Sequence, residues 1–310
     1  MRLINLIPTG TTVRFLHFRK AALIFSLITC VASVGLFAFK GLNFGIDFRG
    51  GILLEIRTPE PADMRVIRDR ISGLNLGHFE LQEFGQNTDI LIRIERQPGA
   101  APEQQMAVEA VKQALGSAVD YRRTEFVGPT VSGELIEAGV TAVLLALAAM
   151  LMYIWFRFEW QFGVGAVVAL IHDVIMTIGV FALLGLEFNL STVAAILTIA
   201  GYSINDTVVV YDRVRENLRK YKVMKLEDVL NLSLNDTLSR TLLTSITTLI
   251  ALLILFFWGG EVIKGFSFAM IWGVLVGTYS SIFVAAPLLI HMNLRAEDVA
   301  LDKDDSAETV

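Results

Sequence analysis

The chain has 310 residues, of which 54% are hydrophobic, and its formal net charge is −5. A soluble domain with a mean hydropathy of +0.58 would expose large apolar patches to water, so the composition favours a membrane protein. The single cysteine, Cys30, excludes an intrachain disulfide framework, and the four histidines match no metal-binding spacing. We therefore expect no metal and no cofactor.

Six apolar runs are long enough to cross a bilayer, which takes about 20 residues in a helix. The first covers residues 21–39, which is long for the apolar part of a secretory signal, and no signal-cleavage pattern follows it. The other five cover residues 135–156, 163–184, 190–211, 242–258 and 266–290. This pattern predicts an N-terminal segment (1–20), a first span (21–39), an outside domain (40–134), a five-helix region (135–291) and an acidic tail (292–310).

The distribution of Lys and Arg predicts how the spans are oriented, since these residues are retained on the cytoplasmic side. They gather before the first span and between the fourth and fifth spans: Arg2, Arg14, Arg19, Lys20, Arg213, Arg215, Arg219, Lys220, Lys222, Lys225 and Arg240. The turn after the third span has none, and the turn after the fifth has only Lys264. Both termini are therefore expected in the cytoplasm, with residues 40–134 on the opposite side of the membrane.

Between the first and second spans, charged residues return and the apolar runs shorten. Strand patterns cover residues 52–57, 78–84, 89–95 and 121–127, with a turn at residues 85–87. Helical patterns cover residues 62–72 and 102–115. The order β-α-β-β-α-β predicts a ferredoxin-like α+β domain, whose free sheet edges can pair with an extended chain. A docking module for a partner protein fits the same pattern equally well.

Asp206 is the clearest polar residue inside an expected span, where an ionisable group costs about 2.5–3.5 kcal/mol to insert. Without a partner this carboxylate favours its neutral form, whereas a nearby guanidinium favours the charged form. Arg240, near the cytoplasmic end of the fifth span, carries such a guanidinium and stays charged at any relevant pH. A carboxylate whose cationic partner can approach or withdraw acts as a proton switch. We therefore predict that Asp206 and Arg240 form a proton relay.

Other polar residues in the expected spans give weaker signals. His172 and Asp173 lie about halfway along the third span, where structural pairing and a secondary relay are equally good interpretations. Tyr202 and Asn205 lie near Asp206 in the sequence. Like His172 and Asp173, they are predicted as secondary relay or helix-pairing residues. For the hydroxyl groups of the fourth, fifth and sixth spans, packing between helices is the simpler interpretation.

The segment directly after the first span, Gly45-Ile46-Asp47-Phe48-Arg49-Gly50-Gly51, resembles the signature of the SecD/SecF family of bacterial protein-export subunits. Four further stretches agree with that family: residues 127–135, His172-Asp173-Val174, residues 201–217 and Ser239-Arg240-Thr241-Leu242. Six spans and one short outside domain fit the SecF branch better than SecD. The motif also has a structural interpretation as a tight turn, so we predict Gly45, Asp47, Gly50 and Gly51 as a hinge between the first span and the domain.

The resemblance implies a function that composition cannot reveal. SecF proteins pair with SecD to form one twelve-span transporter of the RND superfamily, and the pair associates with the SecYEG channel, YajC and YidC. The pair uses the proton-motive force to promote export of unfolded preproteins across the bacterial inner membrane. In this resemblance Asp206 and Arg240 match the family's transmembrane proton-relay residues. Membrane lipid is a further expected partner, and neither enzymatic activity nor nucleic-acid binding is expected.

Three other functions have to be distinguished from this one. Half of an RND-type small-molecule exporter has the same spans, and copurification of a SecD partner separates the two. A passive translocon scaffold keeps every span but has no use for Asp206. A rhomboid-type intramembrane protease also has six spans, but Gly201-Tyr202-Ser203-Ile204 lacks the final glycine of its GxSG motif, and His291 lies at the extreme end of its span.

Overall fold

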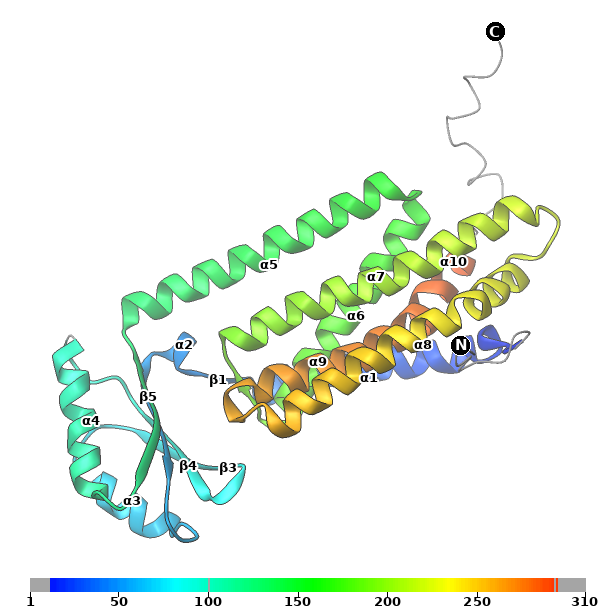
Figure 1. Cartoon of the computed structure of the whole chain (residues 1–310). Helices are drawn as coiled ribbons and strands as arrows, with labels where there is room; N and C mark the ends of the chain where they lie inside the picture. The colour runs from blue at the N-terminus through cyan, green and yellow to red at the C-terminus, as the bar shows by residue number, and fades with distance from the viewer. Residues whose placement is uncertain (1–11, 100, 293, 295–310) are drawn as a thin grey trace. The chain divides into compact units, whose positions relative to one another are not determined.

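The computed structural model describes residues 12–99, 101–292 and 294, and the chain forms two compact units (Figure 1). The helical unit contains Val143–Leu186 together with the described residues before Asn43 and after Leu190. The sheet unit contains Asn43–Ala142 and Glu187–Leu190. The first eleven residues of the expected N-terminal segment and most of the expected acidic tail lie outside the described residues.

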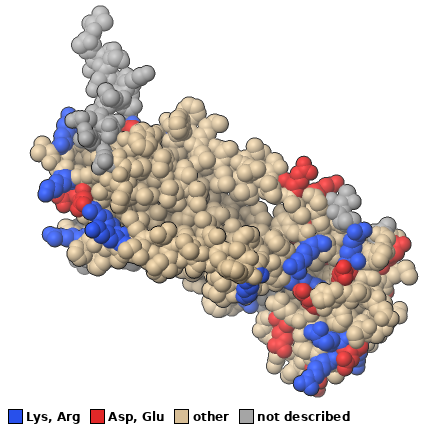
Figure 2. All heavy atoms as spheres, turned by 180° about the vertical axis from the view of Figure 1, so that it is seen from behind, with Lys and Arg blue, Asp and Glu red and all other residues tan. Residues whose placement is uncertain are grey.

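Six helices in the described part of the chain are long and apolar enough to cross a membrane, which confirms the predicted number. They are α1 (Arg19–Lys40), α5 (Pro129–Arg157), α6 (Trp160–Leu184), α7 (Leu190–Lys220), α8 (Leu226–Trp258) and α9 (Glu261–Ser280). A 3-10 turn, η1 (Phe15–Phe18), precedes α1, and α9 continues through the π-helix η2 (Ser281–Ala285) into α10 (Ala286–His291). Helices suit these runs because they satisfy every backbone polar group without water. On the face shown in Figure 2, the described helical surface is almost free of charged residues except at one end.

α7 and α8 extend furthest beyond the predicted spans. α7 continues past residue 211 to Lys220, and α8 begins at Leu226 instead of residue 242. The added turns are amphipathic and form a polar-lined hairpin, which apolar content alone cannot reveal. In it, Asn217 Nδ2 donates to Ser233 Oγ at 3.0 Å, and Arg213 Nε donates to Asp236 Oδ2 at 2.8 Å.

Two glycines let α9 approach α7 closely. Gly273 and Gly277 are four residues apart and share one face of α9, as in the Gly-x-x-x-Gly pattern of membrane helices. A Cβ atom added at Gly273 would lie 2.3 Å from Cγ1 of Ile199, and one added at Gly277 would lie 3.2 Å from Cβ of Ser203. The absence of side chains at both positions therefore sets the distance between these two helices.

The sheet unit has the predicted ferredoxin-like order of elements. They are β2 (Gly51–Arg57), α3 (Met64–Ser72), β3 (Phe79–Phe84), β4 (Gln86–Ile94), α4 (Ala101–Leu115) and β5 (Asp120–Val127). The strands pair antiparallel in the order β3-β4-β2-β5. Alternate residues of β2 and β4 face α3 and α4 and form the core of the unit: Ile52, Leu54, Ile56, Ile90, Ile92 and Ile94.

Three short elements were not predicted. β1 (Asn43–Phe44) pairs in parallel with β6 (Glu187–Phe188), which joins segments far apart in the sequence. α2 (Ile46–Arg49) occupies the predicted hinge turn, and Ile46 packs against Leu53 and Leu91 on the sheet face opposite α3 and α4. Strands of two residues carry no detectable alternation, so only the folded chain reveals them.

An ion pair with a buried carboxylate joins β2 to β4 in the sheet unit. Arg57 donates from Nε and Nη2 to both carboxylate oxygens of Asp89, which is 3% exposed. These hydrogen bonds hold the pKa of Asp89 below its usual value. The two residues are direct neighbours at the last pairing position of β2 and β4, so the ion pair stabilises that end of the two strands.

The first prediction concerns the contact between α7 and α9. Gly273→Ala places a methyl group against Ile199, and we expect this overpacking to lower the free energy of unfolding by about 1–3 kcal/mol. Thermal unfolding of the detergent-solubilised chain measures the effect. Gly201→Ala is the matched control, because its added Cβ meets no atom within 4 Å. Equal stability of the two variants would contradict the close approach.

The second prediction concerns acid sensitivity of the sheet unit. Because folding lowers the pKa of Asp89, its contribution to stability is present above the usual value of about 3.8 and is lost as the pH falls through the folded-state pKa. We expect Asp89→Asn to weaken hydrogen-exchange protection of β2 and β4 at neutral pH. The protection of this variant should then decrease less than that of wild type as the pH falls. Asp120→Asn is the control, since Asp120 is largely exposed. Parallel acid profiles for wild type and Asp89→Asn would contradict this assignment.

Candidate functional site

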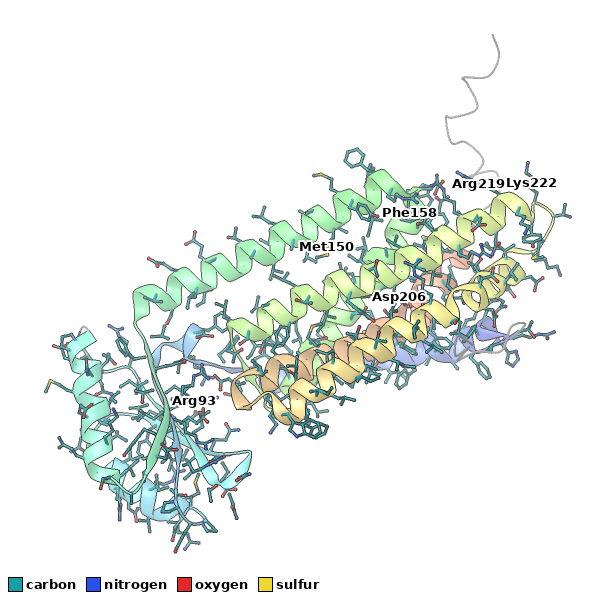
Figure 3. The ribbon with its side chains drawn as sticks, viewed as in Figure 1. Arg93, Met150, Phe158, Asp206, Arg219 and Lys222 are labelled. Atoms are coloured by element: carbon teal, nitrogen blue, oxygen red, sulfur yellow. The ribbon has the colours of Figure 1, made fainter. Side chains whose placement is uncertain are left out.

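Among the described residues of the helical unit, two carboxylates are buried, Asp206 of α7 and Asp173 of α6. Asp206 is 8% exposed and Asp173 is 0% exposed, so both depend on protein groups for their hydrogen bonds. Figure 3 shows Asp206 within the bundle, whereas Arg219 and Lys222 lie near the far end of α7. Ionisable groups enclosed by apolar spans usually have a functional role, so these two residues define the candidate site.

Asp206 is held by hydroxyl groups from two other elements. Thr241 of α8 donates to Oδ1 at 2.7 Å, and Ser281 of η2 donates to Oδ2 at 2.5 Å. Both donors are buried. The carboxylate therefore links α7 to α8 and to the π-helical segment that follows α9.

Arg240, the predicted partner of Asp206, is not among these donors. Its side chain is exposed, and the residue that faces Asp206 is the next one, Thr241. Successive residues of an α-helix point about 100° apart, so a helix that presents Thr241 turns Arg240 away. The Arg240 charge nevertheless acts on Asp206 through space. The structure thus brings the predicted relay residues near each other without pairing them.

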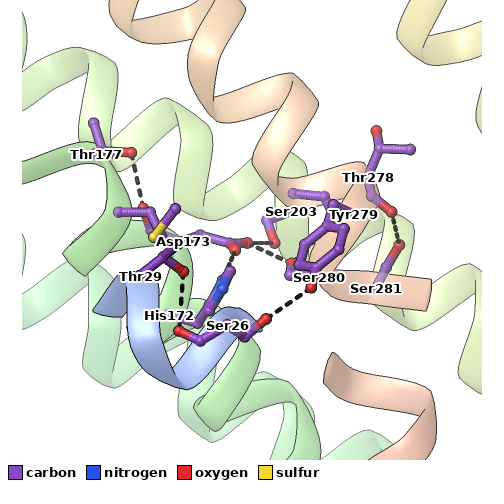
Figure 4. Close-up of polar contacts among 12 residues, drawn as sticks. Ser26, Thr29, His172, Asp173, Thr177, Ser203, Thr278, Tyr279, Ser280 and Ser281 are labelled. Carbon is purple, nitrogen blue, oxygen red and sulfur yellow. Dashed lines mark hydrogen bonds and ion pairs between the residues drawn. The ribbon is translucent and has the colours of Figure 1, made fainter. Parts of the chain in front are cut away.

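Asp173 has a fuller set of partners (Figure 4). Ser203 of α7 donates to Oδ2 at 2.5 Å, and Ser280 of α9 donates to the same oxygen at 2.8 Å. His172 Nδ1 lies 2.8 Å from Oδ1. The two predicted residues of α6 are therefore in direct contact, and their network extends to α7 and α9.

His172 connects this network to α1. Its ring stacks on Tyr279, with the ring centroids 6.1 Å apart, and its Nε2 has no hydrogen-bond partner among the described residues. The Tyr279 hydroxyl donates to the carbonyl of Ala22 at 2.9 Å and lies 2.9 Å from Ser26 Oγ. Polar groups of α1, α6, α7 and α9 therefore belong to one connected network around Asp173.

The other two predicted residues lie outside these cages. Tyr202 is only loosely linked, with its hydroxyl 3.5 Å from Ser245 Oγ, and Asn205 is exposed. Ser203 belongs to the Asp173 cage, but Asp173 separates it from His172. In a Ser-His-Asp protease the histidine contacts the serine directly, and here His172 contacts Asp173 instead of Ser203.

The residues that hold the two carboxylates were not predicted as site residues: Ser203, Thr241, Ser280 and Ser281. Packing was the simpler interpretation for hydroxyl groups in the spans, and most of them do fill that role. The usable signal was the pair of adjacent serines in the sixth span, because neighbouring helical residues point in different directions and reach different partners.

The predicted hinge motif is bound to the segment that begins α7. Asp47 Oδ2 accepts a hydrogen bond from the backbone N–H of Leu190 at 2.8 Å, and Gly45 N donates to the carbonyl of Phe188 at 2.9 Å. A Cβ added at Gly45 would lie 2.5 Å from Glu187 Oε1. Asp47 thus satisfies a free N–H at the start of α7, where a negative charge is favourable.

A charged pair and three aromatic rings complete this contact, which we call the latch (residues 43–50, 187–190 and Arg93). Arg93 of β4 donates to Glu187 Oε2 at 2.5 Å and to Asn43 Oδ1 at 3.0 Å. Phe44, Phe48 and Phe188 pack with ring centroids about 6 Å apart. In the latter half of the motif, Gly50 and Gly51 have φ of +71° and +117°, a conformation that favours glycine.

These features define a polytopic membrane protein of the transporter type, with hydroxyl-caged carboxylates inside its spans and one ferredoxin-like domain between the first two. Comparison with protein families narrows the class. Residues 107–295 match the family model for the C-terminal part of SecD/SecF protein export membrane proteins, and residues 35–58 match the SecD/SecF GG motif. The chain therefore belongs to the SecD/SecF family.

Individual relatives point to one branch of this family. The chain is 46% identical over 295 residues to protein translocase subunit SecF of Rickettsia rickettsii, covering 92% of this chain and 94% of the relative. It is also 46% identical to the SecF subunit of Rhodobacter capsulatus, covering 97% and 95%.

Two solved structures have the same architecture. The crystal structure of SecDF from Thermus thermophilus, described as a translocon-associated membrane protein, matches with a TM-score of 0.84 and 34% identity. A SecDF structure in the super-membrane-facing form matches with a TM-score of 0.66 and 32% identity. Both alignments cover 93% of this chain but only 40% of the SecDF chain.

The third prediction tests the latch. The Arg93 side chain is 12% exposed, so Glu187→Ala leaves a mostly buried guanidinium without its closest carboxylate. We expect a local loss of about 1.5–3 kcal/mol, measured as faster hydrogen exchange at residues 43–50 and in the first turn of α7. Glu80→Ala is the control, because Glu80 lies 3.8 Å from Arg93 and is half-exposed. The latch assignment fails if both variants exchange like wild type.

Proposed function

We propose that this chain is the SecF subunit of a bacterial protein translocase, which works with SecD and uses the proton-motive force to promote preprotein export. The names of its relatives and their coverage along nearly their whole length support this assignment. The alignment covers only 40% of the SecDF chain, whereas relatives named SecF are covered to 94% and 95% of their length, which supports SecD as a separate partner. The proposal involves no enzymatic step.

The surface of the helical unit is compatible with a partner inside the membrane. α5 buries none of its apolar window within the described chain, and the window of α1 is 11% buried. Such helices need lipid or another protein against them. SecD is the partner we assign to these spans, with SecYEG, YajC and YidC as further components from family resemblance.

The proposed arrangement places the chain in the inner membrane with both termini in the cytoplasm. The concentration of Lys and Arg before α1 and between α7 and α8 supports this orientation. It puts an outside domain at 40–134, followed by the five-helix region at 135–291. Unfolded preprotein would meet the outside domain, whose edge strands β3 and β5 have free sides for pairing.

The observation that supports proton coupling most directly is the cage around Asp206, which has two hydroxyl donors and a cation nearby but unpaired. A carboxylate in this position can exchange its hydroxyl donors for Arg240 when the spans shift. A proton that moves inward releases about 2.3 kcal/mol per 100 mV, enough to bias a two-state equilibrium substantially. The existence of a named super-membrane-facing form of SecDF is consistent with such a transition.

The latch offers a route from this switch to the outside domain. α7 carries Asp206, and its first residue is bound by Asp47 of the hinge motif. Movement of α7 would therefore act on the motif that leads from the first span into β2. In this proposal, Gly45, Asp47, Gly50 and Gly51 transmit the motion.

The fourth prediction tests the coupling carboxylate. In cells depleted of the native protein, Asp206→Asn should insert and bind SecD but lose proton-dependent export of a secreted reporter, because its side chain cannot take up a proton. Asp212→Asn is the control because it makes the same change on the same helix. Asp212 is partly exposed and paired with Arg157.

Each other outcome identifies a different function. Full export by Asp206→Asn would favour a passive scaffold and remove Asp206 from the mechanism. Failure of the wild-type chain to bind SecD, together with efflux of small molecules, would favour half of an RND-type exporter.

A further inference from the structure

Asp173 is a buried carboxylate that the proposed switch does not use. Titratable and polar groups of three helices reach it: His172 of α6, Ser203 of α7 and Ser280 of α9, and Tyr279 stacks on His172. Cys30 of α1 also lies within range of its charge. No Lys or Arg among the described residues forms an ion pair with it. Asp173 is 0% exposed, so these protein groups replace water as the hydrogen-bond partners of its carboxylate.

The cages of Asp173 and Asp206 share two structural elements. On α7, Ser203 donates to Asp173, and Asp206 follows one turn later. At the end of α9, Ser280 donates to Asp173 and the next residue, Ser281, donates to Asp206. The two serines lie at the junction between α9 and the π-helix η2, and π-helical turns frequently occur at functional sites.

Each of the two serines has a second acceptor within reach. Ser280 Oγ lies 3.1 Å from the carbonyl of Gly277, and Ser281 Oγ lies 3.1 Å from the carbonyl of Thr278. A hydroxyl group has one hydrogen, so it can serve the carboxylate or the carbonyl of its own helix. The protonation state of the carboxylate decides between them, because a neutral carboxyl group itself becomes a donor.

We propose that Asp173 is a second proton-binding residue of the transport cycle and that Ser280 and Ser281 couple it to Asp206. When a proton binds Asp173 Oδ2, one O–H bond forms there, and this group then donates to Ser280 Oγ. The Ser280 hydrogen turns to the Gly277 carbonyl. The same exchange at Asp206 turns Ser281 toward Thr278, so both protonation events act on one short segment. This inference rests on the proposed proton-coupled function.

The fifth prediction tests whether Asp173 takes up protons at all. In infrared difference spectra between alkaline and acid pH, protonated carboxyl groups give a C=O band. The sample is the full chain with SecD in lipid vesicles. We expect Asp173→Asn and Asp206→Asn each to lose a different part of this band, whereas Ser267→Ala should match wild type. Ser267 is a buried hydroxyl of α9 without a hydrogen-bond partner among the described residues. A wild-type spectrum from Asp173→Asn would overturn the proposal.

The coupling between the two residues has its own readout. Asp206→Asn should change the shape or pH dependence of the band that remains from Asp173, and Ser280→Ala should abolish this influence. If Asp173→Asn fails to bind SecD, Ser280→Ala alone is compared with Ser267→Ala, and an unchanged Asp173 band would count against the proposal.

Export assays separate this inference from the proposed function. We expect Asp173→Asn to lose proton-dependent export and Asp173→Glu to restore part of it. If Asp173→Asn exports normally while Asp206→Asn loses proton-dependent export, the role of Asp173 is overturned and the proposed function remains intact. Normal export by Asp206→Asn would overturn the proposed function, and the infrared result would then decide the proton-binding role of Asp173 by itself.

Discussion

A carboxylate inside an apolar helix bundle must obtain its hydrogen bonds from protein, because an unsatisfied ionised group in such surroundings costs many kcal/mol. In this chain the donors for Asp173 and Asp206 come mainly from other helices, α7, α8, α9 and η2. Separation of any of these helices would remove at least one hydrogen bond from a buried carboxylate. The polar centre therefore sets the register of the spans, while Gly273 and Gly277 let α9 approach α7 closely enough to form it.

The same constraint explains why hydroxyl groups, and not cations, surround the buried carboxylates. A permanently charged partner such as Arg240 would hold Asp206 in one state, whereas a hydroxyl can donate or accept. The exposed position of Arg240 keeps its charge close without a fixed pair. In the proposed function, a network of this kind would adjust to a bound proton by small rotations of its hydroxyl groups, so the helices would keep their hydrogen bonds.

Much of the fold could be predicted because its signals are local. Apolar length identified the six spans, and alternation with turn residues identified the ferredoxin-like order of the sheet unit. The helical extensions of α7 and α8 were missed because an amphipathic helix continues past the membrane without a change in periodicity. The pairing of β1 with β6 depends on contacts between residues far apart in sequence, which periodicity does not report.

The candidate site was predictable only in part, for a geometric reason. The cost of burying charge identified Asp206 and Asp173 from sequence alone. It could not distinguish Arg240 from Thr241, because one residue along a helix changes the direction of a side chain by about 100°. Nor could it say which carboxylate each of Ser280 and Ser281 contacts, since that depends on how the helices pack around them.

The latch has a consequence for biogenesis. Asp47 and Arg93 are synthesised well before Glu187 and Leu190. These two early residues therefore lack their latch partners until two further spans, α5 and α6, have been inserted. Those two crossings return the chain to the side on which the sheet unit folds. The first turn of α7 then acquires its cap from a segment already made. The latch can therefore form only after those two spans have brought the chain back to that side.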